Sequence, residues 1–190
     1  PDRIRDLQPP DAGEILARDG ANLAAVLATL ARKHPDRKNR LIEFMKLVVP
    51  GIHSVSHKVL GPKETLEFVE ASGASDKARK FLASSMSDGT LRALGVLTAL
   101  YQSPNGGDPI PLIGIEEPET ALHPAAAGVL LDGLREASAS RQVLVTSHSS
   151  DLLDRPDIPV DSILAVTQDE GKTVIAPLDD AGRKALKNRL

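Results

Sequence analysis

Two short apolar runs with a helical segment between them restrict the fold of this chain more than any other feature. The runs are LIGI at residues 112–115 and VLVT at residues 143–146. Uninterrupted runs of this kind are typical of strands covered on both faces of a parallel sheet. Residues 124–137 between them have helical periodicity, and Pro124 stands in the first turn, where proline is tolerated. This order predicts an α/β layer with parallel core strands flanked by helices.

The first part of the chain has a different pattern, which predicts an α+β segment over residues 1–83. Apolar residues at helical spacing indicate helices, and alternating β-branched residues around Gly61-Pro62 indicate a β-hairpin. The expected elements are an entry loop at residues 1–20, helices around 23–30 and 41–48, strands at 52–60 and 65–69, and a short strand near 81–82.

The second part, residues 84–190, is expected to form a separate α/β portion. Leucines at helical spacing predict a helix over residues 88–101, just before the first apolar run. ILAV at 163–166 and TVIA at 173–176 flank QDEGK and predict a second hairpin near the end of the sequence.

Composition excludes several classes of function. The chain has no cysteine, which excludes disulfides, thiolate catalysis and cysteine-ligated zinc. Aromatic residues make up 2%, so base stacking is not expected, and the net charge of −3 gives no global indication of a nucleic-acid surface. No apolar run approaches the roughly 20 residues of a membrane-spanning helix, and the first residues lack the apolar stretch of a signal peptide. We therefore expect a cytoplasmic protein without a membrane partner.

Two adjacent carboxylates, Glu116 and Glu117, follow the LIGI run directly and precede Pro118. The carboxyl end of a parallel strand borders the crevice where ligands bind. Because successive strand residues point to opposite sides, one carboxylate can face a metal while the other faces an attacking water. This arrangement suits nucleotide hydrolysis. The alternative is a surface loop with two solvated glutamates.

Two further segments carry candidate phosphate-binding residues. Ser87 stands immediately before the predicted helix 88–101, with Gly89 in its first turn, and a helix N-terminus with free N–H groups can bind an anion. His148 lies just beyond the VLVT run and can donate to a phosphate oxygen or hold a water. An ordinary capped helix and a loop histidine with satisfied partners are the alternatives.

In this order and spacing, the three segments resemble the ABC-type ATPase family, in the branch that contains RecF-like, SMC-like and overcoming-lysogenization-defect-like ATPases. The likeness covers about residues 84–154. MSDGT (86–90) is similar to the signature motif LSGGQ, and LIGIEEPE to the Walker B strand with Glu116 in the Asp position. ALHP (121–124) resembles the D-loop, and TSHS (146–149) the switch-histidine loop.

The resemblance implies a role for each matching residue in binding ATP and Mg²⁺. Glu117 would be the catalytic carboxylate that orients the attacking water, and Glu116 would support Mg²⁺. His148 would contact the γ-phosphate and couple it to that water. One departure concerns Glu116, which is one methylene longer than the family's Asp and so alters the metal geometry.

The signature and D-loop residues are implied to act across a dimer interface. Ser87 and the Gly89 amide would bind the γ-phosphate of a nucleotide held by the opposite protomer, and His123 would lie in the D-loop at that interface. Asp88 replaces a glycine of the signature and brings a negative charge near the phosphate. We expect this signature to bind nucleotide more weakly, or only in a closed dimer.

The chain lacks the phosphate-binding P-loop, GxxxxGK[ST], that such an ATPase needs. Its only GK[ST] begins at Gly171, and the position five residues earlier is Val166 instead of glycine. Because QDEGK lies between two predicted strands, we interpret it as a hairpin turn. We expect the chain to be the C-terminal part of a longer ATPase whose missing half carries the P-loop, and to be inactive alone.

The main hypothesis for the intact protein is an ATP-driven switch. Two heads would form a homodimer around two ATP molecules and separate on hydrolysis, in DNA repair or phage defence. The alternative is a non-catalytic nucleotide-responsive binding or dimerisation module. DNA binding has one local indication, the basic stretch RKHPDRKNR at 32–40, for which a solvated connection between helices is the simpler explanation.

Overall fold

The computed structural model describes residues 2–71, 78–104, 110–153, 155 and 158–187. The chain divides into two units, Pro1–Ser147 and His148–Leu190. The domain boundary predicted at residue 84 is based on the sequence motifs. It differs from the division into these two units and stays a prediction.

The first unit contains five described α-helices, and all but the first lie where the apolar periodicity predicts them. They are α1 (Asp2–Arg5), α2 (Leu23–Lys33), α3 (Pro35–Val48), α4 (Asp88–Tyr101) and α5 (Pro124–Ser138), with a short 3-10 helix, η1 (Ala83–Ser85), before α4. The prediction of an entry loop over residues 1–20 is wrong in part. Residues 2–5 are helical, Ile4 is buried, and Gln8 forms an isolated antiparallel bridge with Glu64. Long-range packing therefore orders this segment.

Two sheets of different type belong to this unit. Strands β1 (Ile52–Leu60), β2 (Lys63–Glu70) and β3 (Arg79–Leu82) are antiparallel in the order β1-β2-β3. Strands β4 (Leu112–Glu116) and β5 (Gln142–Thr146) are parallel, with Leu112 opposite Gln142 and Glu116 opposite Thr146. The predicted mixed α/β architecture, with a parallel pair and an α+β segment carrying a β-hairpin, is confirmed.

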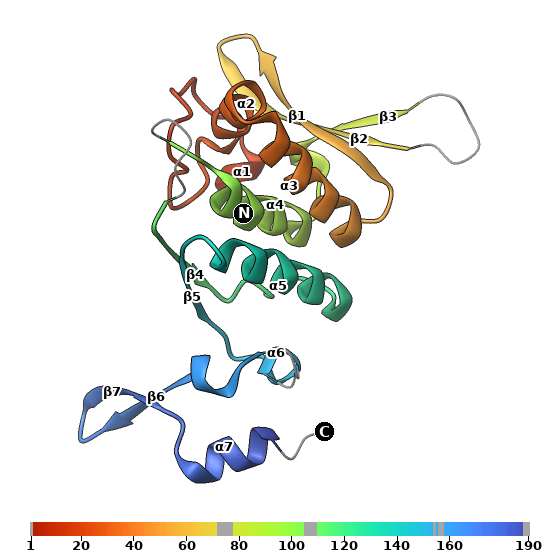
Figure 1. The fold of residues 1–190 in the computed structure, drawn as a ribbon. Coiled ribbons are helices and arrows are strands. Elements are labelled where there is room, and N and C mark those ends of the chain that lie inside the picture. Colours follow the sequence, from red (N-terminus) through yellow and green to blue (C-terminus); the bar gives the residue numbers. More distant parts are fainter. Residues whose placement is uncertain (1, 72–77, 105–109, 154, 156–157, 188–190) are drawn as a thin grey trace. The chain divides into compact units, whose positions relative to one another are not determined.

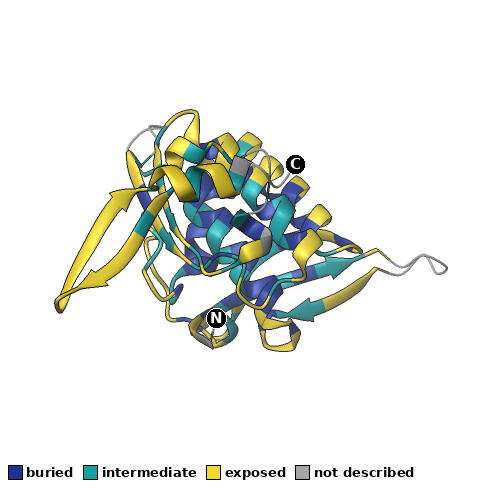
Figure 2. Ribbon diagram, turned by 90° about the horizontal axis from the view of Figure 1, so that it is seen from below, coloured by how far each residue is buried: buried dark blue, intermediate teal, exposed yellow. Residues whose placement is uncertain are grey.

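The helices α2 to α5 form the core between the two sheets (Figure 1). Helices α2 and α3 pack on β1, while α4 and α5 contact β4 and β5 respectively. Figure 2 colours the buried residues dark blue and the exposed ones yellow, and each of these helices carries residues of both kinds. Fully buried aliphatic side chains fill the space, in agreement with the low aromatic content: Leu23, Leu27, Leu41, Leu66, Leu91, Leu94, Leu97 and Leu100.

The expectation that both faces of the parallel strands are buried is wrong for this chain. Ile113 points into the core and is 7% exposed, whereas Leu112 and Leu144 on the outer face are 55% and 56% exposed. The physical reason is that the helices of this unit cover one face only. An uncovered face is unusual for a parallel sheet.

The second unit contains α6 (Ser150–Leu153), η3 (Val160–Ser162), β6 (Leu164–Asp169), β7 (Lys172–Pro177) and α7 (Asp180–Lys187). Strands β6 and β7 pair antiparallel, so the predicted hairpin is confirmed. Glu170 and Gly171 form its two-residue turn with φ angles of 45° and 78°, which suits a type I′ turn. The GK[ST] segment is therefore part of a hairpin. Among the described helices, none is long and apolar enough to cross a membrane.

Candidate functional site

The carboxylate pair lies at the carboxyl end of β4. Glu116 is the last residue of the strand, and the Glu117 N–H continues the pairing by donating to the Thr146 carbonyl at 2.9 Å. Glu117 then adopts a φ of 44°, in the left-handed region that non-glycine residues rarely occupy. Such a backbone costs on the order of 1–3 kcal/mol and persists only where its surroundings hold it.

The two carboxylates have different environments. The Glu116 side chain is 81% exposed, and its Oε1 lies 3.9 Å from Nη2 of Arg18. Glu117 is half-buried, and its Oε2 accepts a hydrogen bond of 3.2 Å from Oγ1 of Thr120. One carboxylate is therefore open and the other is held by its own turn; because Glu117 lies beyond β4 with a left-handed backbone, the turn and not strand alternation sets this difference.

Glu116 fits a supporting role toward Mg²⁺. In nucleotide sites Mg²⁺ is usually held by one or two carboxylates together with water and substrate phosphates. No group of three His, Asp or Glu side chains that could hold a metal occurs among the described residues. Glu116, with its side chain 81% exposed, would supply one carboxylate oxygen to such an ion.

Arg92 on α4 contacts the end of this strand. Its Nη2 donates to the carbonyl oxygens of Glu116 and Glu117, at 2.8 Å and 2.9 Å. Guanidinium donors form the stronger class of hydrogen bond because they are charged. The contact fixes the backbone on both sides of the left-handed turn, although sequence patterns gave no indication of this role for Arg92.

The N-terminus of α4 has the predicted cap. The Ser87 Oγ accepts from the Thr90 N–H at 3.2 Å and lies 2.8 Å from the Thr90 hydroxyl. Gly89 in the first turn is packed against the D-loop segment: a Cβ there would lie 2.3 Å from the Ala121 carbonyl oxygen. Ala121 itself has a φ of 64°. Helix α4 and the turn after β4 therefore contact one another at Gly89 as well as at Arg92.

Asp88 is paired with a residue from the first helix of the chain. Its Oδ1 accepts a hydrogen bond from Nη2 of Arg5. Nη1 of Arg5 also donates to the carbonyl oxygens of Ser84 and Met86, at 3.2 Å and 2.7 Å. The negative charge that Asp88 adds to the signature is therefore paired with the positive charge of Arg5.

His123 caps the next helix. Its Nδ1 accepts from the Ala125 N–H at 3.3 Å at the start of α5. The D-loop histidine predicted from the resemblance thus has a structural role within the chain, and its imidazole remains exposed. Its place at a dimer interface stays a prediction.

The segment after β5 reaches back to the same turn. The Ser147 hydroxyl donates to Oε1 of Glu119 at 2.5 Å, only two residues beyond Glu117. His148 is the first residue of the second unit, so its geometry relative to Glu117 stays a prediction.

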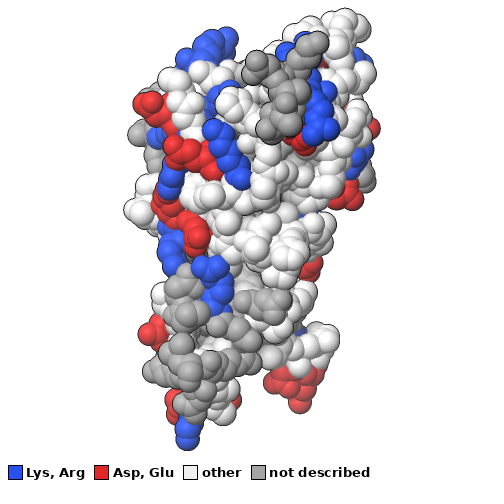
Figure 3. Space-filling view, turned by 90° about the vertical axis from the view of Figure 1, so that its right-hand side faces the viewer, with Lys and Arg blue, Asp and Glu red and all other residues white. Residues whose placement is uncertain are grey.

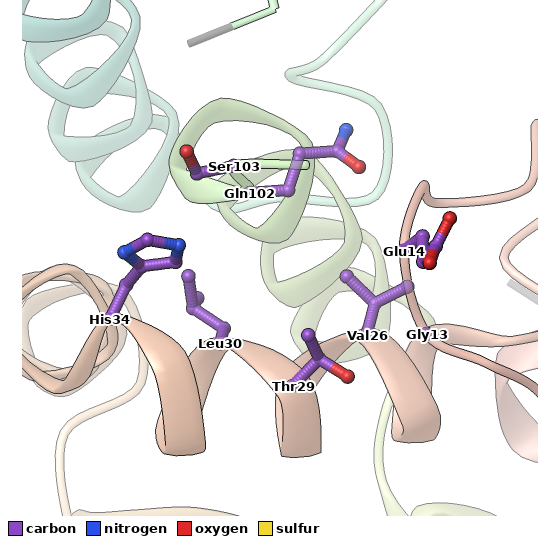
Figure 4. A pocket seen from close by; sticks show the side chains of 8 residues that line it. All are labelled: Gly13, Glu14, Val26, Thr29, Leu30, His34, Gln102 and Ser103. Carbon is purple, nitrogen blue, oxygen red and sulfur yellow. The ribbon is translucent and has the colours of Figure 1, made fainter. Parts of the chain in front are cut away.

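Two cavities differ greatly in size. One of about 340 Å³ lies beside β4, and its lining includes Arg18, Arg92, Gly114 and Glu116. Its volume is within the ~300–1,000 Å³ range of ligand pockets. The other, shown in Figure 4 between α2 and the end of α4, has a volume of about 10 Å³ and can hold about one water.

The sequence predicts the residues at the end of β4 and at the start of α4, but it does not predict the arginines that contact them. Arg92 follows Gly89 at i+3 on the same helix face, a spacing that could have indicated contact with the same segment. Arg5 lies 83 residues before Asp88, and no local pattern indicates that pairing.

Comparison with known proteins identifies a matching family. A family profile described as "AAA domain, putative AbiEii toxin, Type IV TA system" matches residues 7–154. No curated protein matches the chain.

Several solved SMC structures are similar in fold. An SMC ATPase studied for ATP-driven dimerization and DNA-stimulated activation is 15% identical, with a TM-score of 0.59, over 84% of this chain and 93% of that one. The SMC head with coiled coil and joint from Pyrococcus yayanosii is 18% identical, with a TM-score of 0.56, over 82% and 29%. An SMC head bound to the C-winged helix domain of ScpA is 17% identical, with a TM-score of 0.57, over 92% and 49%.

The chain thus spans less than half of the last two structures. The identities support the fold alone, whereas the family profile covers most of the sequence, including both glutamates and the α4 N-terminus. The fold is that of an SMC-type ATPase head, and the chain belongs to the AAA domain family whose profile it matches.

Proposed function

We propose that this chain supplies the signature, Walker B and switch-histidine parts of an ATPase that binds and hydrolyses ATP in a head-to-head homodimer. One observation carries the proposal. The carboxylate pair at the end of β4 and the capped N-terminus of α4 belong to one unit, joined by the bonds from Arg92 to the Glu116 and Glu117 carbonyls. The two motifs that the resemblance assigns to ATP are therefore held by a direct contact.

Each of these residues has a distinct proposed role in ATP binding or hydrolysis. Glu117, whose carboxylate is held by Thr120, orients the attacking water and accepts its proton. Glu116 is the open carboxylate for Mg²⁺, which when bound neutralises the developing charge on the phosphates. His148 contacts the γ-phosphate, while Ser87 and the Gly89 amide contact a nucleotide held by the other protomer.

The proposal requires a second component with a P-loop. The open outer face of β4 and β5, with Leu112 and Leu144 more than half exposed, supports further packing there. The cavity lined by both α4 and β4, with Glu116 in its lining, supports a ligand site beside the carboxylate pair. We propose that the 190 residues alone do not turn over ATP, because GxxxxGK[ST] is absent from them.

A second candidate is a nucleotide-responsive module without turnover. The acidic residue in the signature, Asp88, favours it. A link to DNA repair or phage defence is also proposed, from the resemblance. In Figure 3, basic side chains on the face shown lie among acidic ones, and Arg40 of the basic stretch is bound to Glu136. These observations give little support to a DNA surface.

The test is phosphate release by the protein that carries this sequence together with its P-loop. Glu117→Gln should lower turnover by about a hundredfold or more, because it removes the proton acceptor, while ATP-induced dimers accumulate. Glu14→Gln, an exposed glutamate outside the site, is the matched control and should leave turnover unchanged.

Normal hydrolysis by the Glu117→Gln variant would show that the assignment of the catalytic carboxylate is wrong. If the parent protein dimerises with ATP but releases no phosphate, the module without turnover is correct. Glu117-dependent phosphate release by the 190-residue chain alone would overturn the proposal that it is inactive.

A further inference from the structure

The acidic residue in the signature poses an electrostatic problem. Asp88 is the first residue of α4, directly after the Ser87 cap, and its side chain is 58% exposed. An aspartate in the first turn interacts favourably with the helix dipole. The same charge would repel a phosphate that approaches the free N–H groups of this helix end.

Arg5 lies against this aspartate in a fixed orientation. Its guanidinium binds three acceptors, which are Oδ1 of Asp88 and the carbonyl oxygens of Ser84 and Met86. A planar guanidinium bound on both terminal nitrogens has little freedom to rotate. The Arg5 side chain is 31% exposed, so water screens its charge less than on an open surface.

The helix that carries Arg5 is itself anchored. Ile4 is 6% exposed, and a Cβ on Gly95 of α4 would lie 3.2 Å from its Cδ1. Gln8 is 2% exposed and is bonded through its side chain to the Arg3 carbonyl, the Gly20 carbonyl and the Ala24 N–H. The N-terminal segment therefore presents Arg5 to α4 as part of the packed unit.

We propose that Arg5 is a positioning and charge-compensating residue for the signature, which neutralises Asp88 so that the triphosphate of a nucleotide can approach the N-terminus of α4. This inference rests on the proposed function. It assigns to the first helix a part in nucleotide-driven dimerisation, and it explains how an aspartate can stand at this position of the motif.

The experiment compares four variants of the full protein that also carries Glu117→Gln, with ATP-dependent dimerisation measured by analytical ultracentrifugation. Arg5→Ala should weaken ATP-dependent dimerisation by about tenfold or more, because an uncompensated like charge at an interface is strongly unfavourable. Adding Asp88→Gly to Arg5→Ala should restore it, since no charge is then left to compensate. Asp88→Gly alone should dimerise at least as tightly as the parent, because it removes the negative charge and keeps the positive charge of Arg5 beside the phosphate. Arg5→Lys should retain most of the affinity.

Salt provides a second readout. Repulsion between Asp88 and phosphate is screened as ionic strength rises, so the defect of Arg5→Ala should shrink relative to the parent between low and high salt. A purely structural role, through the Ser84 and Met86 carbonyls, predicts a defect that salt leaves unchanged and that Asp88→Gly does not rescue. Either result overturns the inference.

Failure of the inference is distinguishable from failure of the proposed function. If the parent dimerises with ATP and Arg5→Ala dimerises equally well, only the inference is wrong. If the parent does not dimerise with ATP, the proposed function fails and the inference fails with it. If thermal unfolding shows that Arg5→Ala does not fold, the Arg5→Lys and Asp88→Gly variants test the inference instead. Loss of dimerisation in both would contradict charge compensation.

Discussion

Nη2 of Arg92 lies 2.9 Å from the carbonyl oxygen of Glu117, the residue with a φ of 44° at the end of β4. The same nitrogen donates to the Glu116 carbonyl at 2.8 Å. One side chain from α4 thus holds the backbone of both candidate carboxylates, and the predictions that follow depend on this connection.

Arg92→Ala should lower turnover in the complete protein by up to about a hundredfold, because small displacements of catalytic groups have effects of this size. The KM for ATP should change much less, since Arg92 contacts the carbonyls that position Glu117. Steady-state kinetics measures both constants. Arg79→Ala, an exposed arginine on β3, is the control. A change in KM with unchanged kcat would instead indicate a binding role.

Gly89→Ala should destabilise the first unit by about 1–3 kcal/mol, because the added methyl would lie 2.3 Å from the Ala121 carbonyl oxygen and must displace backbone. The matched control is Gly95→Ala in the same helix. Its added Cβ would lie 3.2 Å from the end of the Ile4 side chain, which can move. Urea denaturation followed by circular dichroism compares the two. Equal stability of both variants would contradict the close packing of α4 on the D-loop segment.

Ser87 allows capping to be separated from phosphate binding. Ser87→Ala should lower the free energy of unfolding by about 1 kcal/mol, through loss of the bond to the Thr90 N–H. Ser87→Asp retains a capping oxygen and should keep this stability, but it places a carboxylate at the proposed phosphate site. ATP-dependent dimerisation of the Glu117→Gln protein should therefore be lost in Ser87→Asp. If that variant dimerises normally, Ser87 is only a cap.

Glu136 should make stability depend on pH in the acidic range. Its carboxylate accepts from Arg40 and from the Tyr101 hydroxyl, and the Arg40 hydrogen bond is the main cause that holds its pKa below the usual glutamate range. Because the folded pKa is lowered, this stabilisation is present above the ordinary glutamate pKa of about 4.3 and is lost as pH falls through the folded value.

Urea midpoints measured from pH 7 down to pH 3 check this dependence. Glu136→Gln should be less stable than the parent at neutral pH, and its stability should fall less steeply as the solution is acidified. Glu14→Gln, at an exposed glutamate outside this contact, is the control. An unchanged slope in Glu136→Gln would show that the contact with Arg40 contributes nothing measurable to folding.

The elements could be predicted because their signals are local. Leucine spacing gave α4 over residues 88–101, and the helix spans Asp88–Tyr101. The LIGI and VLVT runs gave the parallel pair β4 and β5, and the Ser87 cap was also confirmed. In each of these cases residues that are close in sequence determine the element, either through the periodicity of apolar side chains or through the capping residue at a helix end.

The amino-acid sequence by itself determined which residues lie at the end of β4 and at the start of α4, because apolar periodicity and capping act over a few positions. Only the tertiary structure decided that Arg5 meets Asp88 across 83 residues, that Arg92 binds the Glu116 and Glu117 carbonyls, and that the outer face of β4 stays open. Such contacts depend on how elements distant in sequence pack. An arginine can bind many different acceptors, and only the packed structure determines which of them lies within reach.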